Sequence, residues 1–196
     1  STTANPLGYL KYTYTASEIQ PDMLNADITQ TTDSPSWGGL YLQYFEKFDQ
    51  VQQQKGILSV TKKLFIEKIG SDGKQELLPL GKEKLKTGDK VITRLTLSLK
   101  QDMDFLYLKD FRAACFEPIG QLSGNQWKFG TVYYEESKDA VTNFFFNSLA
   151  KGTYVLEYPV WVNQAGTYQD GIATFQSMYA PEYTAYSEAG KITVTK

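Results

Sequence analysis

The chain has 196 residues, of which 41% are hydrophobic and 21% charged, with a formal net charge of −2; this balance is typical of one large or two small globular domains. Acidic and basic residues are mixed along the chain, so no basic stripe offers the surface that nucleic-acid binding needs. Histidine is absent, which removes the usual general base, the usual transition-metal ligand and every Ser-His or Cys-His nucleophile pair, so we expect no enzyme, no metal and no cofactor.

The first 54 residues predict an accessory β segment. "LGYLKYTYT" and "MLNADITQ" are typical of two strands, and the apolar "SWGGLYLQYFEKF" (36–48) could be a strand or a short helix. "DQVQQQKG" (49–56) reads as a polar joint. A strand pair of this size is not stable alone, so we expect it to pack on something else.

Residues 55–196 predict an antiparallel β-sandwich of immunoglobulin or fibronectin type, so the fold class is all-β. "VITRLTLSL" (91–99) alternates apolar and polar side chains with period two, and "DFLYLKDF" (104–111) sets Phe105, Tyr107 and Lys109 against two leucines. Turn signals recur at roughly 10-residue spacing, as in a sandwich. Asp72-Gly73 predicts a tight hairpin. Further strands are expected at 59–68, 130–137, 141–149, 152–162, 171–180 and 191–195.

The single cysteine, Cys115, lies in "DFRAACFEPIG". A reactive cysteine needs a cationic or helix-N-terminal setting, usually with a histidine partner. Here the neighbours are apolar, so we interpret Cys115 as a small buried residue of a core strand. One cysteine cannot form an internal disulfide, so the apolar core must hold the fold.

Six acidic residues could provide paired carboxylates for glycoside hydrolysis or ligands for calcium. The spacing of two of them resembles part of a calcium loop, but the expected glycine and glutamate do not follow. Solvated strand ends and turns are the favoured interpretation. The residues are Asp102, Asp104, Asp110, Glu135, Glu136 and Asp139.

Aromatic residues offer a different hypothesis, a cell-surface adhesion or glycan-binding sandwich with an aromatic platform. The same side chains are also what two packed sheets need for a core. The candidates are Trp37, Tyr41, Tyr44, Phe45, Trp127, Tyr133, Tyr134 and Trp161.

"QSMYAPEYTAYSEAGKITV" (176–194) leaves a strand, passes through an aromatic loop with a proline, and re-enters a short strand. Its exposed aromatic character suggests a contact surface, and a loop folded back on its own domain is the alternative. The residues concerned are Met178, Tyr179, Pro181, Tyr183 and Tyr186.

This stretch, with the preceding "LAKGTYVLEYPVWVNQAGTYQDGIATFQ", resembles the C-terminal end of bacterial alpha-2-macroglobulins. "SWGGLYLQYFEKFDQV" is similar to the segment that follows the family's thioester domain. "LKTGDKVITRLTL" and "DMDFLYLKDFRAACFEP" resemble strands of its last macroglobulin-like domain, the second especially as it occurs in the Bacteroidetes-type members. The resemblance covers nearly the whole chain.

The resemblance implies a non-catalytic module of a multidomain, protease-trapping inhibitor of the bacterial envelope, in the periplasm or anchored as a lipoprotein. The implied partners are the thioester domain of the same chain and, through the parent protein, proteases. Met178 and Tyr179 match a pair that shields the thioester from water, with Pro181, Tyr183 and Tyr186 holding their loop. Cys115 is followed by Phe-Glu-Pro, so it does not match the Cys-Gly-x-Gln thioester motif.

The chain shows no apolar run long enough to cross a membrane as a helix, and "STTANPLGYL" lacks the plan of a signal peptide. We therefore expect either a cytosolic protein or a fragment of a larger, exported precursor, and no direct membrane insertion. The resemblance favours the second.

Overall fold

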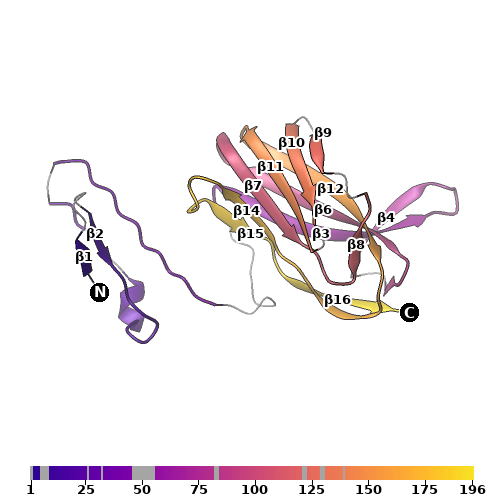
Figure 1. Ribbon diagram of the computed structural model, residues 1–196, viewed down its shortest axis with the longest axis horizontal. Coiled ribbons are helices and arrows are strands. Elements are labelled where there is room, and N and C mark those ends of the chain that lie inside the picture. The colour runs from indigo at the N-terminus through magenta and orange to yellow at the C-terminus, as the bar shows by residue number, and fades with distance from the viewer. Residues whose placement is uncertain are drawn as a thin grey trace. The chain divides into compact units, whose positions relative to one another are not determined.

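The computed structural model (Figure 1) describes residues 2–4, 9–25, 27–31, 33–45, 56–81, 84–120, 123–128, 131–138 and 140–196. The chain divides into two compact units, Ser1–Gln43 and Tyr44–Lys196. The predicted boundary after residue 54 lies outside the described residues, so the domain limits given above stay a prediction.

The first unit contains little regular structure. Strands β1 (Thr2–Ala4) and β2 (Leu10–Tyr12) pair antiparallel, and a short 3-10 helix, η1, covers Pro21–Leu24. The strand predicted from "MLNADITQ" is wrong, since η1 takes its first residues and the described residues 25 and 27–30 form no strand. Residues 36–45 form neither strand nor helix, and the side chains described between 9 and 45 are exposed.

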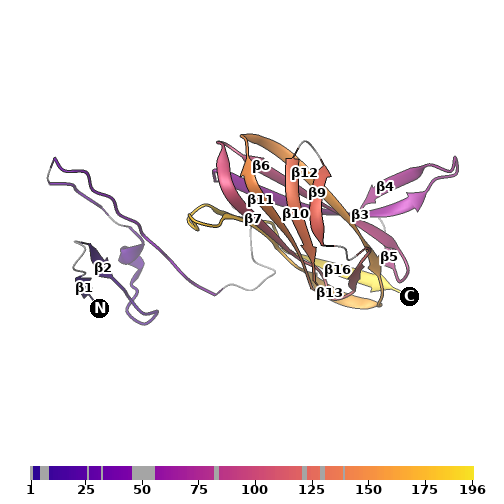
Figure 2. The same ribbon diagram turned by 45° about the horizontal axis from the view of Figure 1, so that its top comes forward.

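The second unit is a sandwich of antiparallel sheets, with one parallel pair between β16 and β5. Its six-stranded sheet has the order β15-β14-β7-β11-β10-β9, its five-stranded sheet β4-β3-β6-β12-β8, and a small sheet β13-β16-β5 (Figures 1 and 2). The strands are β3 (Leu58–Ile69), β4 (Gln75–Pro79), β5 (Leu85–Lys86), β6 (Lys90–Leu99), β7 (Met103–Phe111), β8 (Phe116–Pro118), β9 (Gly124–Lys128), β10 (Thr131–Ser137), β11 (Val141–Leu149), β12 (Gly152–Val162), β13 (Gly166–Asp170), β14 (Ala173–Ser177), β15 (Thr184–Tyr186) and β16 (Gly190–Thr195).

Period-two alternation builds the core of this unit. Every second residue of β6 is buried, from Val91 to Leu99, and β7 buries Leu106 and Leu108 while Tyr107 stays half-exposed. Side chains from both large sheets meet between them, and the largest fully buried ones include Phe144, Phe146, Phe175, Leu95, Leu97 and Leu156. The predicted all-β sandwich is therefore confirmed, and the described residues contain no α-helix.

The hairpin predicted at Asp72-Gly73 connects β3 and β4. Gly73 has φ 78°, a left-handed conformation that glycine adopts without steric cost. The Asp72 carboxylate accepts a hydrogen bond from the Lys74 backbone N–H at 3.0 Å, which closes the turn.

None of the helices in the described ranges is long and apolar enough to span a membrane.

Candidate functional site

The loop between β14 and β15 lies at the edge of the six-stranded sheet, since β15 is its outermost strand (Figure 1). Backbone hydrogen bonds order it from within: Ser177 N–H donates to the Tyr183 carbonyl at 3.0 Å and Tyr183 N–H to the Ala180 carbonyl at 2.9 Å. The Thr184 hydroxyl donates to the Pro181 carbonyl at 2.6 Å. The loop therefore holds a defined conformation although its tip faces solvent.

Met178 and Tyr179 occupy that tip and are 50% and 78% exposed. The Phe105 ring, 48% exposed, meets the Tyr179 ring edge to face at a centroid distance of 5.2 Å. Met178 N–H also donates to the Phe105 carbonyl at 2.9 Å. These three residues, Phe105, Met178 and Tyr179, form what we call the tip patch.

Phe105 reaches the tip patch through an unusual backbone conformation. Its φ is 52°, the left-handed region that costs a residue with a side chain about 1–3 kcal/mol. The ladder between β7 and β11 omits Phe105 while pairing Asp104 with Ser148 and Leu106 with Phe146. Phe105 was not predicted as a site residue, although its outward position beside Tyr107 indicated that a large apolar side chain would be exposed.

The other predicted loop residues are not part of the tip. Tyr183 packs partly buried against the core, and Pro181 is exposed in the turn. Tyr186 lies within β15, paired with Thr174, and not in the loop.

Cys115 is completely buried, as predicted, but it lies in the turn between β7 and β8 instead of a strand. Its carbonyl accepts a hydrogen bond from Asn163 N–H at 2.9 Å, and Phe116 N–H closes the turn on the Ala113 carbonyl. Burial raises the pKa of the Cys115 thiol to about 11. The thiol is therefore an inert packing group at neutral pH.

We expect Cys115 to react with a thiol reagent such as dithionitrobenzoate at least about a hundredfold more slowly in native buffer than in denaturant, because the thiol must first become exposed. The measurement is the absorbance time course at pH 8 with and without guanidinium chloride. Equal rates in the two buffers would show that Cys115 is accessible.

The predicted carboxylates do not converge. Asp102 accepts a hydrogen bond from Lys151 N–H at 2.7 Å, and Glu136 accepts one from the Asn143 amide at 2.9 Å. Asp104 is exposed, Asp110 is buried, and Asp139 lies outside the described residues. No group of three or more potential metal ligands occurs in the part of the chain that the structure describes.

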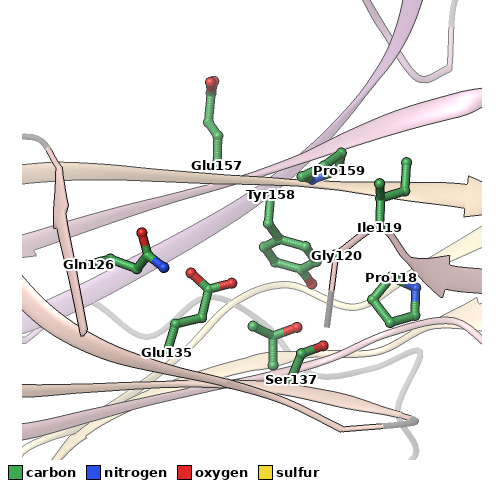
Figure 3. A pocket seen from close by; sticks show the side chains of 10 residues that line it. Pro118, Ile119, Gly120, Gln126, Glu135, Ser137, Glu157, Tyr158 and Pro159 are labelled. Atoms are coloured by element: carbon green, nitrogen blue, oxygen red, sulfur yellow. The ribbon is translucent and has the colours of Figure 1, made fainter. Parts of the chain in front are cut away.

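An open pocket beside β8 and β12 brings one of these acids to its wall (Figure 3). Figure 3 shows the Glu135 side chain near Gln126, whereas Glu157 points away from both. The Glu157 carboxylate instead bonds to the Arg94 guanidinium. The pocket therefore lacks the facing pair of carboxylates that glycoside hydrolysis would need.

The predicted aromatic platform is likewise divided. Tyr133 is buried in the core, while Tyr134 and Trp161 are 42% and 45% exposed. Tyr134 does belong to a row of rings on β10, β11 and β7, beside Phe145 at 6.2 Å and, through it, Tyr107 at 5.0 Å. Trp37, Tyr41, Tyr44 and Phe45 are exposed, and the Trp127 side chain lies outside the described atoms.

A cluster of buried charges in the second unit was not predicted. The Lys62 ammonium, with 2% of its side chain exposed, lies 3.0 Å from an Asp110 oxygen and 2.9 Å from an Asp170 oxygen. It also donates to the carbonyls of Phe111 at 2.7 Å and Gly171 at 2.9 Å. We call Lys62, Asp110 and Asp170 the buried triad.

Two further buried polar residues accompany the buried triad: Tyr158 contacts Asp110, and Arg112 follows Asp110 by two positions in the chain. The Tyr158 hydroxyl donates to the second oxygen of Asp110. Arg112, 7% exposed, donates to the Thr142 hydroxyl and the Lys138 carbonyl. The interpretation of Asp110 as a solvated strand end is therefore wrong, because its side chain follows the inward phase of Leu106 and Leu108.

Residues 58–182 match the family model described as the bacterial alpha-2-macroglobulin MG10 domain. The chain belongs to the bacterial alpha-2-macroglobulin MG10 domain family. The matched residues run from the first strand of the sandwich through the tip patch, so both the buried triad and the exposed loop lie inside the MG10 domain. The finer prediction of a Bacteroidetes-type member stays a prediction.

Solved alpha-2-macroglobulins have a similar fold. The Escherichia coli protein activated by porcine elastase matches with a TM-score of 0.58 and 20% identity over 74% of this chain and 14% of that one. The Salmonella protein reacted with methylamine matches with 0.57 and 20% over 74% and 10%. The native Escherichia coli fragment from domain MG7 to the C-terminus matches with 0.55 and 17% over 74% and 24%.

At these identities the likeness shows the fold alone, and this MG10 chain spans between a tenth and a quarter of the structures it matches. No curated protein sequence matched it.

Proposed function

We propose that this MG10 chain is a non-catalytic module of a bacterial alpha-2-macroglobulin that packs through its tip patch against the thioester domain of the same protein. The observation that carries the proposal is an ordered but exposed apolar tip. Phe105, Met178 and Tyr179 are each at least 48% exposed, although the loop that carries two of them is fixed by hydrogen bonds.

The cost of this arrangement favours a partner. A left-handed Phe105 and a solvent-facing aromatic pair both reduce the stability of the free module. Such features are retained where an exposed apolar patch is covered by another surface. Rigid aromatic rings are the side chains that contribute most to such contacts.

The side chains of the tip patch are suited to keep water away from a thioester. A thioester is lost to water unless its surroundings exclude it, and a thioether beside two aromatic rings offers no hydrogen-bond partner to hold water there. The parent protein would then use the reactive bond only after protease cleavage rearranges its domains. In this proposal the parent traps proteases in the bacterial cell envelope, and MG10 contributes the cover and no catalytic group.

The proposal is tested in the full-length protein that carries this chain. Replacing both Met178 and Tyr179 by alanine is expected to speed methylamine incorporation about tenfold, since removing roughly 1.4 kcal/mol of ring and thioether contact opens the site by that factor. Phe105→Ala is expected to give a smaller increase, because it removes only the ring that positions Tyr179. The measurement is the rate of labelled methylamine uptake before any protease is added.

Trp161→Ala is the matched control, since Trp161 is similarly exposed but lies on β12 of the five-stranded sheet. It should leave the rate unchanged. In parallel, a photo-reactive benzoylphenylalanine at position 179 should cross-link to the thioester domain, whereas one at Val132 should not. Unaltered amine uptake together with no cross-link from position 179 would refute the shield.

A further inference from the structure

The buried triad joins three sheets. Lys62 lies on β3, the first strand of the five-stranded sheet, and Asp110 on β7 of the six-stranded sheet. Asp170 is the last residue of β13 in the small sheet. An amine and two carboxyl groups, far apart in sequence, thus meet at about 3 Å in a site almost closed to water.

We propose that Lys62 and Asp170 form an intramolecular amide bond, with Asp110 as the residue that carries the proton. This is a covalent modification of the second unit and does not depend on the tip patch. The bond would link β3 covalently to the end of β13. The resulting ring would contain residues 62–170, which form most of the sandwich.

The enforced proximity of the three side chains favours amide formation, a reaction that is unfavourable between free amines and acids in water. Groups held in contact react as if at effective concentrations of about 10⁵–10⁸ M. Burial of charges is costly, and amide formation removes the Lys62 charge from the core. Since the site excludes water, the reverse hydrolysis is slow once the expelled water has left.

Amide formation needs no reagent beyond the three side chains of the buried triad. The Lys62 ammonium passes one proton to the Asp110 carboxylate and becomes an amine. The amine Nζ attacks Cγ of the neutral Asp170 acid, so an N–C bond forms, and a hydroxyl leaves with a second proton from Nζ as water. Asp110 shuttles these protons and ends neutral beside the amide, so an ammonium, a carboxylate and an acid become an amide, an acid and one water.

Asp170, and not Asp110, is assigned as the acid that is attacked. Burial and the Asp110 charge favour the neutral form of Asp170, whose pKa is raised although Lys62 opposes that rise. Its side chain is 13% exposed, which gives the leaving water a way out, whereas Asp110 is 0% exposed. Asp110 is also held by the Tyr158 hydroxyl, which suits a group that stays in place.

The backbone segments around the buried triad also approach each other closely. A Cβ at Gly171 would lie 2.3 Å from the Phe111 carbonyl oxygen, so only glycine permits this approach. Both carbonyls, of Phe111 and Gly171, accept from the Lys62 nitrogen, which aims Nζ at the carboxyl groups. After reaction the remaining N–H has an acceptor in place.

The test is the intact mass of the folded 196-residue chain under denaturing mass spectrometry. We expect a mass lower than that of the sequence by one water, and a branched tryptic peptide that joins the segments containing Lys62 and Asp170. A mass equal to that of the sequence would overturn the proposal and leave the triad as ion pairs. A branch to Asp110 would overturn the assignment of the attacked acid.

Variants distinguish amide formation from other reactions that release water. Asp72-Gly73 and Asp170-Gly171 can each lose water by closing to a succinimide, which gives a linear peptide instead of a branched one. Lys62→Arg and Asp110→Asn are expected to keep the full mass, and Lys63→Arg, on the outward face of β3, to show the loss unchanged. A water loss that persists in Lys62→Arg, with no linear succinimide peptide to account for it, would contradict the amide.

Discussion

Replacing Lys62 by alanine is expected to lower the free energy of unfolding of the chain by at least about 3–5 kcal/mol, the range for breaking a buried ion pair by removing one partner, and by more where the amide has formed, because the substitution then also removes a covalent cross-link. The substitution leaves Asp110 and Asp170 in the core without the nitrogen that contacts both of them. It also removes four close contacts of that nitrogen, two of them to backbone carbonyls. Guanidinium denaturation followed by circular dichroism measures the change.

Lys63→Ala is the matched control, because Lys63 is the next residue of β3 and its side chain is exposed. Surface substitutions of this kind change stability by about 0.5 kcal/mol or less. Equal losses for Lys62→Ala and Lys63→Ala would show that the buried triad does not stabilise the fold.

Raising the pH from about 8 to about 12 is expected to reduce the free energy of unfolding by about 5 kcal/mol through two buried groups. Burial raises the pKa of Tyr133 from 10.0 to about 12 and that of Cys115 from 9.0 to about 11. The folded chain therefore keeps protons that the unfolded chain has released. Stability is complete below the unfolded values and is lost as the pH rises through the folded ones.

Tyr158 acts in the same direction, since burial next to Asp110 raises its pKa well above 10.0. The measurement is a series of guanidinium denaturation curves between pH 8 and 12.

Tyr133→Phe isolates one contribution, because phenylalanine cannot ionise. At about pH 12 this variant should lose about 2 kcal/mol less than the unchanged protein, relative to pH 8. Tyr134→Phe, at the neighbouring and 42% exposed position, should follow the unchanged protein. Parallel pH profiles for the unchanged protein and Tyr133→Phe would contradict the role given to burial.

The long strands could be predicted from the sequence because alternation is a local pattern. The predicted 141–149 and 152–162 are the observed bounds of β11 and β12, and 91–99 differs from β6 by one residue. Short strands such as β8 and β15 escaped prediction, since three residues are too few to show a period. In the first unit, the pattern that predicted a strand in "MLNADITQ" gives a short 3-10 helix, η1, at its first residues instead.

The tip patch was only partly predictable. Met178 and Tyr179 were named from the aromatic, proline-containing character of their loop and then matched to a shielding pair through a family resemblance. Phe105, more than seventy residues earlier, joins them only because β7 and β14 are neighbours in the sheet. An outward phenylalanine in the alternation of β7 was the one local sign. The residue types did not indicate the left-handed backbone at Phe105, whose carbonyl accepts from Met178 N–H.

By itself, the sequence determined the β class, the course of the long strands and the burial of Cys115, because side-chain period and polarity act within a few residues. The sequence also indicated buried charges, which were not predicted, through a lysine at an inward position of β3 and an aspartate at an inward position of β7. Only the tertiary structure decided that these two charges meet each other and Asp170. Strand register, sheet packing and the close approach of Gly171 to Phe111 set those distances, and each of these is a long-range property.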